Sequence, residues 1–119
     1  MNELVLIVDD DERNARLAGD VLEHAGMRIL KAASAAEGID AARAHRPDVI
    51  LMDLRLPDLD GSAAAQRLAE DPATAGIPVV ALSAIRSEEW TADSAFTGYV
   101  EKPIDVRALP GQIRGHCRS

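Results

Sequence analysis

The sequence has a single cysteine, Cys117, which excludes an internal disulfide and any metal site built from several cysteines. It also lacks long hydrophobic runs, because no stretch approaches the roughly 18 apolar residues that a membrane-spanning helix requires. The opening residues, MNELVLIVDDD, carry neither the basic segment nor the cleavage-like site of a signal peptide. These absences predict a cytoplasmic protein with no membrane partner.

Basic residues are also in short supply, with 13 Lys and Arg against 20 Asp and Glu and a net charge of −7. Nonspecific binding to nucleic acid requires clustered basic side chains, so we expect no nucleic-acid partner. The length of 119 residues suits one compact domain, and an apolar content of 47% is enough for an ordinary core.

Five short apolar runs recur at similar intervals along the chain. They are LVLIV (4–8), RILKA (28–32), VILMD (49–53), VVAL (79–82) and GYVE (98–101). The first, third and fourth are nearly continuous in aliphatic residues. Such runs are typical of strands that are buried on both faces of a parallel sheet.

Helical patterns fill the gaps between these runs. In residues 13–25, apolar residues follow the i, i+3, i+4, i+7 spacing of one helix face, and Gly26 stands where a left-handed C-terminal cap is expected. Ser34 and Glu37 have the Ser-x-x-Glu spacing of a capping box, which predicts the start of a second helix. A third helix is predicted over residues 62–70, where strong helix formers predominate.

Two more helices are predicted in the last third of the chain. Residues 86–96 are weakly helical, and the final helix lies between about 106 and 117. Pro110 inside a helix would cost about 3 kcal/mol. We therefore expect the final helix to begin near Leu109, with Pro110 in the first turn, where proline is favoured.

The alternation of strands and helices predicts an α/β fold of the (βα)5 type. Right-handed crossovers then place helices on both faces of one parallel sheet, in a doubly wound arrangement. The sequence shows no internal repeat, low-complexity segment or linker. We expect one domain that covers residues 1–119.

Polar residues follow the strands at the edge where their carboxyl ends meet, and ligands of such sheets bind outside this edge. They are Asp9, Asp10 and Asp11 after the first strand, then Asp53, Ser83 and Lys102 at the ends of the third, fourth and fifth. Each alone has an ordinary structural explanation, and Asp11 is well placed to cap a helix. The set as a whole predicts a binding site.

The chemistry of this site begins with charge. Asp9, Asp10 and Asp53 would repel one another unless a cation lay among them, and oxygen ligands without His or Cys favour a hard ion such as Mg²⁺. A bound Mg²⁺ with open positions can take a phosphoryl group, which Lys102 and Ser83 could also contact. A carboxylate can itself be the nucleophile that accepts that group.

The segments LVLIVDDD, DVILMDLRLPDLDG, VVALSA and GYVEKPI cover nearly the whole chain. In these segments the sequence resembles the receiver domain of bacterial two-component response regulators, of the stand-alone chemotaxis or cell-division kind. The resemblance implies a flavodoxin-like fold, a sandwich whose five-stranded parallel sheet has the strand order 2-1-3-4-5. It also implies a phosphorelay signalling protein rather than an enzyme, one that assists only its own phosphoryl transfer and dephosphorylation.

The resemblance implies roles for individual residues in binding metal and phosphoryl group. Asp53 is the phosphoacceptor. Asp9, Asp10 and Asp53 hold Mg²⁺ or Mn²⁺, together with the backbone carbonyl of Arg55.

Further roles follow from the same resemblance. Ser83, the backbone of Ala84 and Lys102 contact the phosphoryl group. Ser83 and Tyr99 form the switch, in which the aromatic ring turns inward as the hydroxyl moves toward the phosphoryl group. The peptide bond that precedes Pro103 is implied to be cis.

The implied partners are a sensor histidine kinase or a histidine phosphotransfer protein as donor, and an effector protein downstream. The effector face consists of the helix expected at 86–96, the strand at 98–101 and the final helix. The protein is expected to be a monomer or a phosphorylation-dependent dimer, and no DNA-binding output domain is expected. The segment from Ser83 to Lys102 is short for the family, which leaves the conformation of residues 84–97 open.

Three alternatives remain open from the sequence. An aspartyl-phosphate hydrolase or mutase usually has a second Asp two residues after its nucleophile, but position 55 is Arg, and 119 residues leave no room for a cap domain. A pseudo-receiver would bind partners without phosphorylation. A receiver fragment of a larger hybrid kinase or regulator would have the same motifs, although the initial Met and the absence of a linker favour a complete protein.

Overall fold

The five apolar runs form one parallel sheet at the centre of the computed structural model, which describes residues 3–54, 56–83, 96–101 and 104–117. The strand order is β2-β1-β3-β4-β5, as predicted. The strands are β1 (Leu4–Val8), β2 (Arg28–Ala32), β3 (Val49–Asp53), β4 (Val79–Ser83) and β5 (Gly98–Glu101). All five residues of the central strand β3 are buried, which explains its unbroken apolar sequence.

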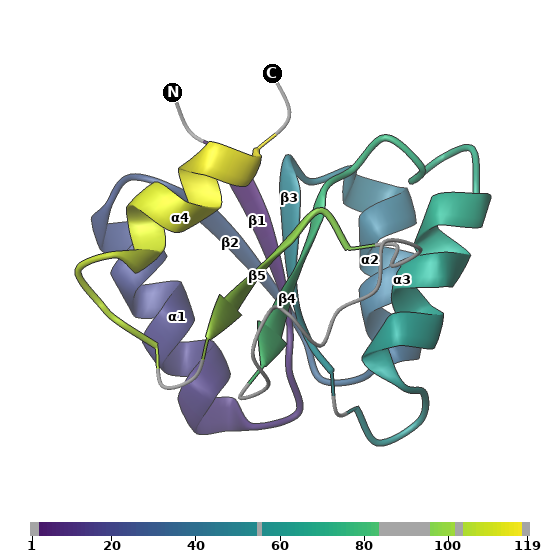
Figure 1. Cartoon of the computed structure of the whole chain (residues 1–119), viewed down its shortest axis with the longest axis horizontal. Helices are drawn as coiled ribbons and strands as arrows, with labels where there is room; N and C mark the ends of the chain where they lie inside the picture. Colours follow the sequence, from purple (N-terminus) through teal and green to yellow (C-terminus); the bar gives the residue numbers. More distant parts are fainter. Residues whose placement is uncertain (1–2, 55, 84–95, 102–103, 118–119) are drawn as a thin grey trace.

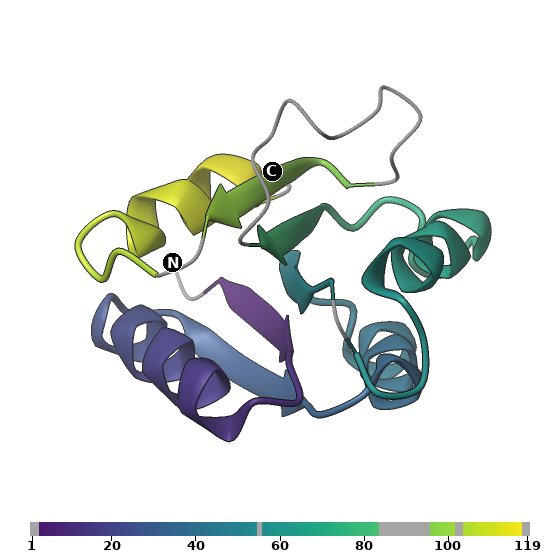
Figure 2. The ribbon, with the colours of Figure 1, turned by 60° about the horizontal axis from the view of Figure 1, so that its bottom comes forward.

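Helices cover both faces of the sheet, which confirms the doubly wound arrangement. They are α1 (Glu12–His24), α2 (Ala35–His45), α3 (Gly61–Glu70) and α4 (Leu109–His116). Figures 1 and 2 show α1 and α4 on one face, and α2 and α3 on the other. The helix predicted at 86–96 falls mostly on residues 84–95, which lie outside the described part of the chain.

The final helix begins where the position of Pro110 predicted. Helix α4 begins at Leu109, and Pro110 stands in its first turn, where a missing N–H costs no hydrogen bond. Leu109 and Ile113 are one turn apart on the buried face of this helix. In the described parts of the chain, none of the helices has the length and apolar character needed to cross a bilayer.

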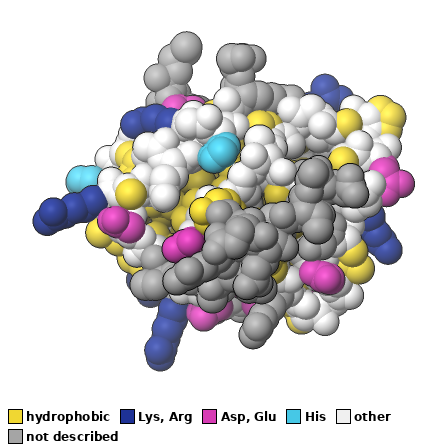
Figure 3. All heavy atoms as spheres, viewed as in Figure 1, with side chains coloured by type: hydrophobic (Ala, Val, Ile, Leu, Met, Phe, Trp, Pro, Cys, Tyr) yellow, Lys and Arg dark blue, Asp and Glu magenta, His cyan; other side chains and the backbone are white. Residues whose placement is uncertain are grey.

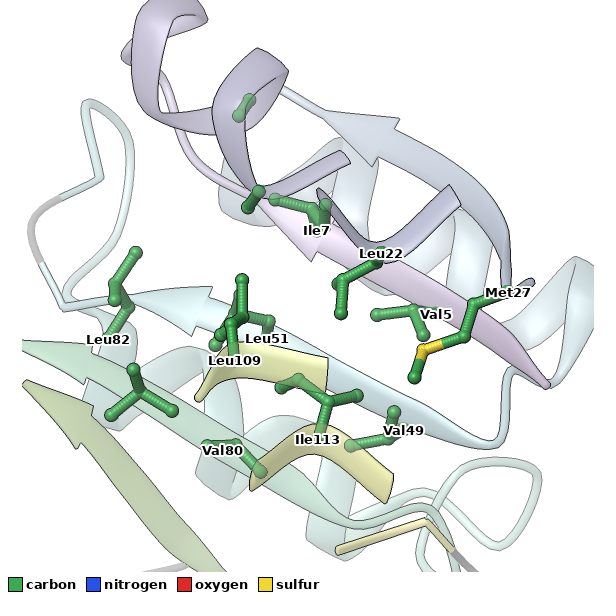
Figure 4. Close-up of a cluster of buried hydrophobic side chains, with 13 residues drawn as sticks. Val5, Ile7, Leu22, Met27, Val49, Leu51, Val80, Leu82, Leu109 and Ile113 are labelled. Atoms are coloured by element: carbon green, nitrogen blue, oxygen red, sulfur yellow. The ribbon is translucent and has the colours of Figure 1, made fainter. Parts of the chain in front are cut away.

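Two hydrophobic clusters fill the layers on either side of the sheet. The first cluster joins α1 and α4 to the sheet through large aliphatic side chains, as Figure 4 shows for Leu22, Leu51 and Ile113. The second cluster lies under α2 and α3 and contains several small residues, among them Ala35, Ala42, Ala64 and Ala65. Small side chains let these two helices approach the sheet closely.

The predicted caps are present, with one difference. Asp11 caps α1 by accepting hydrogen bonds from the backbone N–H groups of Arg13 and Asn14. Gly26 has a φ of 95°, the left-handed conformation expected of it.

Of the two hydrogen bonds in the predicted capping box of α2, only the one to Ser34 forms as predicted. Ser34 accepts a hydrogen bond from the Glu37 N–H at 3.2 Å, as predicted. The Glu37 carboxylate, however, accepts from the N–H of Ala33 at 2.8 Å rather than from that of Ser34. The chain before the cap approaches the helix closely enough for the carboxylate to reach one residue further back.

Candidate metal and phosphoryl site

Three carboxylates converge at the carboxyl edge of the sheet. Each of Asp9, Asp10 and Asp53 offers an oxygen atom, and these atoms all lie within 4.8 Å of one another. Asp9 and Asp53 are only 4% and 5% exposed, whereas Asp10 is open to solvent. The prediction that these three residues come together is confirmed.

The register of the sheet explains this convergence. Strands β1 and β3 are neighbours, and Val8 lies opposite Met52. Asp9 follows Val8 and Asp53 follows Met52, so the two carboxylates lie at the same level of the sheet. The arrowheads of β4 and β5 in Figure 1 point to this edge.

Hydrogen bonds fix the segment that carries Asp9. Its backbone N–H donates to the carbonyl of Ala32 at 3.0 Å, which extends the pairing of β1 with β2. Its Oδ1 accepts from the N–H of Asp11 at 2.9 Å. Of the three consecutive acidic residues, Asp9 and Asp10 therefore contribute to the cluster, while Asp11 caps the helix that follows.

The segment after Asp53 turns back closely on the end of its strand. The N–H of Gly61 donates to the carbonyl of Leu54 at 2.9 Å. A Cβ atom at position 61 would lie 2.6 Å from the backbone oxygen of Asp53 and 2.7 Å from the Cα of Leu54. This close approach requires glycine, and it fixes the start of α3 against the strand end that carries Asp53.

The donor set fits a hard divalent cation. All three side chains are carboxylates, which suit Mg²⁺ and Mn²⁺ better than softer metals. Two of them are buried beside each other, where a cation relieves the mutual repulsion of their charges. The exposure of Asp10 leaves one side of the cluster open for water or a ligand oxygen.

The remaining predicted site residues are described only in part. Arg55, Ala84, Lys102 and Pro103 lie outside the described residues, so their predicted roles stay predictions. Ser83 ends β4 and pairs with Glu101 of β5, which places its backbone at the same edge as Asp53.

The predicted switch residue Tyr99 lies in β5, the edge strand of the sheet. It is half-buried and lines a groove of about 480 Å³ together with Glu101, Gln112 and His116. His116 lies over Gly98, because a Cβ at position 98 would meet the imidazole ring. In the view of Figure 1, the Lys and Arg side chains of the described residues lie apart from one another near the outline of the molecule, as Figure 3 shows.

Sequence reasoning missed one residue near the site, Asp58. Its Oδ1 accepts from the N–H of Ala35 at 2.9 Å, and its Oδ2 accepts from the N–H of Ala36 at 3.0 Å. These two backbone hydrogen bonds lower the pKa of Asp58 below its ordinary value. No local signal could have indicated this contact, because the partners are 23 and 22 residues away in the chain.

Comparison with known proteins identifies a family match and close relatives. The family model of the response regulator receiver domain matches residues 5–114. The polar-differentiation response regulator DivK of Brucella ovis is 37% identical over 119 residues, which cover 98% of this chain and 97% of that protein.

Solved structures show the same fold. A sensor protein from Polaromonas is 28% identical, with a TM-score of 0.89 over 98% of this chain and 96% of that one. The chemotaxis response regulator CheY4 of Vibrio cholerae, at 23% identity, has a TM-score of 0.88 over 97% of this chain and 98% of that one.

Proposed function

The chain belongs to the response regulator receiver family, and from that premise we propose that Asp53 accepts a phosphoryl group in a reaction that depends on Mg²⁺. The family membership makes it a receiver domain of two-component signalling, whose partners are histidine kinases or phosphotransfer proteins. The proposal rests above all on one observation, the three carboxylates whose oxygen atoms lie within 4.8 Å of one another.

The chemistry proposed for Asp53 is a direct displacement at phosphorus. A carboxylate oxygen of Asp53 attacks the phosphorus of a phosphohistidine, and the P–O bond forms as the P–N bond breaks. The donor imidazole leaves with the electron pair of that bond and is protonated. The product is an acyl phosphate on a residue held at the end of β3.

Asp9, Asp10 and Asp53 would hold the cation, with the backbone carbonyl of Arg55 as a further ligand. When bound, Mg²⁺ supplies positive charge that offsets the charge of the carboxylates and of the incoming phosphoryl group. Burial of Asp9 and Asp53 strengthens this effect, because water screens their charges less than those of exposed groups.

Four more residues complete the proposed switch. Lys102 pairs with a phosphoryl oxygen, and the hydroxyl of Ser83 and the backbone N–H of Ala84 donate hydrogen bonds to others. When the Ser83 hydroxyl moves toward the phosphoryl group, the Tyr99 ring turns inward from the groove that it lines beside α4. The phosphoryl group shifts the equilibrium between the inactive and active arrangements only through contacts that differ between the two.

The output in this proposal is a change in protein contacts. The effector face comprises residues 86–96, strand β5 and helix α4, and it changes as Tyr99 moves. The chain acts in the cytoplasm as a monomer or a phosphorylation-dependent dimer. Its own phosphoryl transfer and dephosphorylation are the only reactions that it assists.

Intact-mass spectrometry after incubation with acetyl phosphate tests the proposal. Wild-type protein should gain one phosphoryl mass with Mg²⁺ and none when Mg²⁺ is chelated. Asp53→Asn should gain none, whereas the control Asp40→Asn, which neutralises an exposed carboxylate on α2, should behave as wild type. A folded wild-type chain that bound Mg²⁺ but formed no adduct would instead be a binding module that works without phosphorylation.

A further inference from the structure

The carboxylate of Asp58 joins two elements that are far apart in the sequence. It lies in the loop between Asp53, the last residue of β3, and Gly61, the first of α3. Its two oxygens accept hydrogen bonds from Ala35 and Ala36, the first two residues of α2. The loop that follows the phosphoacceptor is therefore attached to the N-terminus of a different helix.

This attachment completes the capping of α2. The first N–H groups of a helix have no partner within the helix, and they favour negative charge. Ser34 accepts from the third of them, Glu37, and Asp58 accepts from the first two. The first two N–H groups of α2 therefore depend on a side chain from the loop for their hydrogen bonds, and the same bonds fix the position of the loop.

The loop is held at other points as well. At its end, the N–H of Gly61 donates to the carbonyl of Leu54 at 2.9 Å. Along its length, Leu56 and Leu59 are partly buried and pack against the hydrophobic cluster under α2 and α3. With its apolar side chains packed inward and Asp58 bound to α2, the loop has little freedom to move relative to Asp53.

A series of short connections then links the Asp9–Asp10 pair to Asp53 by way of α2 and Asp58. The N–H of Asp9 donates to the carbonyl of Ala32 at 3.0 Å. Three residues later in the chain, the N–H of Ala35 donates to Asp58 at 2.9 Å. Five residues before Asp58 stands Asp53, whose oxygen lies within 4.8 Å of those of Asp9 and Asp10.

We propose that Asp58 is a positioning residue, which sets the separation between Asp53 and the Asp9–Asp10 pair by binding the N-terminus of α2. The inference rests on the proposed function of that cluster as a Mg²⁺ and phosphoryl site. Asp58 does not contact the cation itself. It determines how well the three carboxylates are arranged before the cation arrives, and hence the affinity for Mg²⁺ and the rate of phosphorylation.

Isothermal titration calorimetry with Mg²⁺ alone tests this role. Asp58→Ala removes both hydrogen bonds to α2 and should weaken Mg²⁺ binding by about tenfold, as is common when a group that orients metal ligands is lost. Asp58→Asn keeps an oxygen for one of the two N–H groups and should bind with intermediate affinity. Circular dichroism checks that each variant is folded.

Two control variants separate positioning from simpler effects. Ser34→Ala removes a hydrogen bond from the same turn of α2 without touching the loop, and therefore reports on helix fraying alone. Asp40→Asn removes one exposed negative charge from α2 while leaving the bonds to Ala35 and Ala36 in place, and so reports on charge alone. Both should stay close to the wild-type affinity.

The outcomes separate the positioning role from the proposed function. A loss of affinity confined to the Asp58 variants supports the positioning role. Wild-type affinity in Asp58→Ala, or an equal loss in Ser34→Ala or Asp40→Asn, would overturn it and leave the Mg²⁺ site intact. A wild-type chain with no affinity for Mg²⁺ would overturn the proposed function and the positioning role together.

Discussion

The two edges of the sheet use charge in opposite ways. At the amino edge, Glu3 binds Arg114 at 3.1 Å, and the carboxylate of Asp48 accepts a hydrogen bond from the N–H of Leu4 at 2.8 Å. At the carboxyl edge, Asp9, Asp10 and Asp53 bring three like charges within 4.8 Å of one another. The same strands begin at the first edge and end at the second.

This difference distinguishes a structural use of charge from a functional one. At the amino edge, Arg114 also donates to the carbonyl of Ala25 at 2.5 Å and so ties α4 to the end of α1. Glu3, Arg114 and Asp48 each have an opposite charge or a backbone dipole as a partner there, which stabilises the fold. Carboxylates that converge on one point repel one another, so their arrangement at the other edge makes chemical sense as a site that binds a cation.

The largest expected difference between the edges is in their response to Mg²⁺. At a concentration 100 times the dissociation constant, Mg²⁺ should raise the free energy of unfolding of the wild type by about 2.7 kcal/mol. Asp10→Asn should lose most of this increase, because it removes one of the three carboxylates. Arg114→Met, a change at the amino edge, should keep it. Urea unfolding with and without Mg²⁺ measures both, and an equal loss in the two variants would contradict the comparison.

The carboxyl edge should also tolerate an added methyl group less well than an open helix surface does. Gly61→Ala places a Cβ 2.6 Å from the backbone oxygen of Asp53. Because backbone must shift to admit it, we expect a destabilisation of about 2 kcal/mol, typical of overpacking.

The matched control for Gly61 is Gly111→Ala in α4, where a Cβ would meet nothing within 4 Å. Alanine is the better helix former, so this variant should be more stable by about 0.5–1 kcal/mol. Urea unfolding compares the two. Similar stabilities for both variants would show that the carboxyl edge is less closely packed than the structure has it.

The contact of Arg114 with the end of α1 should contribute a smaller amount. Arg114→Met removes the hydrogen bond to the Ala25 carbonyl and should lower the free energy of unfolding by about 1 kcal/mol, with or without Mg²⁺. Arg107→Met, a change at an exposed position before α4, is the control and should have almost no effect. A dependence of the Arg114 effect on Mg²⁺ would mean that the two edges are coupled.

The smallest expected effect is the pH dependence of the Glu3 contact. A hydrogen bond from its own backbone N–H, together with the hydrogen bond and the positive charge of Arg114, lowers the pKa of Glu3 below its ordinary value of 4.5. A lowered pKa gives stability that is present above the ordinary value and is lost as the pH falls through the folded-state value.

Urea unfolding of wild type and Glu3→Gln, from about pH 6 to about pH 3, checks this sign. Wild type should be the more stable at the upper end, and the difference should vanish toward the lower end. A difference that grew on acidification would contradict the assignment.

Local patterns made much of the fold predictable. Continuous aliphatic runs indicated buried parallel strands, and because the carboxyl ends of such strands share one edge, Asp9, Asp10 and Asp53 were expected to lie together. Pro110 correctly predicted the start of the final helix at Leu109. Each of these signals depends on a few residues that are neighbours in the chain, and can therefore be recognised from the sequence alone.

The contacts that sequence reasoning missed join residues far apart in the chain. Asp58 bonds to α2 over 23 residues, and Arg114 bonds to Glu3 over 111. A carboxylate in a loop or an arginine on a helix surface looks the same whether or not it has such a partner. Likewise, the shift of the Glu37 bond to Ala33 depends on the path of the chain before the helix.

The most direct test of the central claim is to locate the phosphoryl group. Wild-type protein treated with acetyl phosphate and Mg²⁺ is reduced with borohydride, which converts an aspartyl phosphate to homoserine, and is then digested and mapped by mass spectrometry. The account predicts homoserine at position 53, only when Mg²⁺ is present. Modification at another carboxylate, or modification of Asp53 without Mg²⁺, would contradict it.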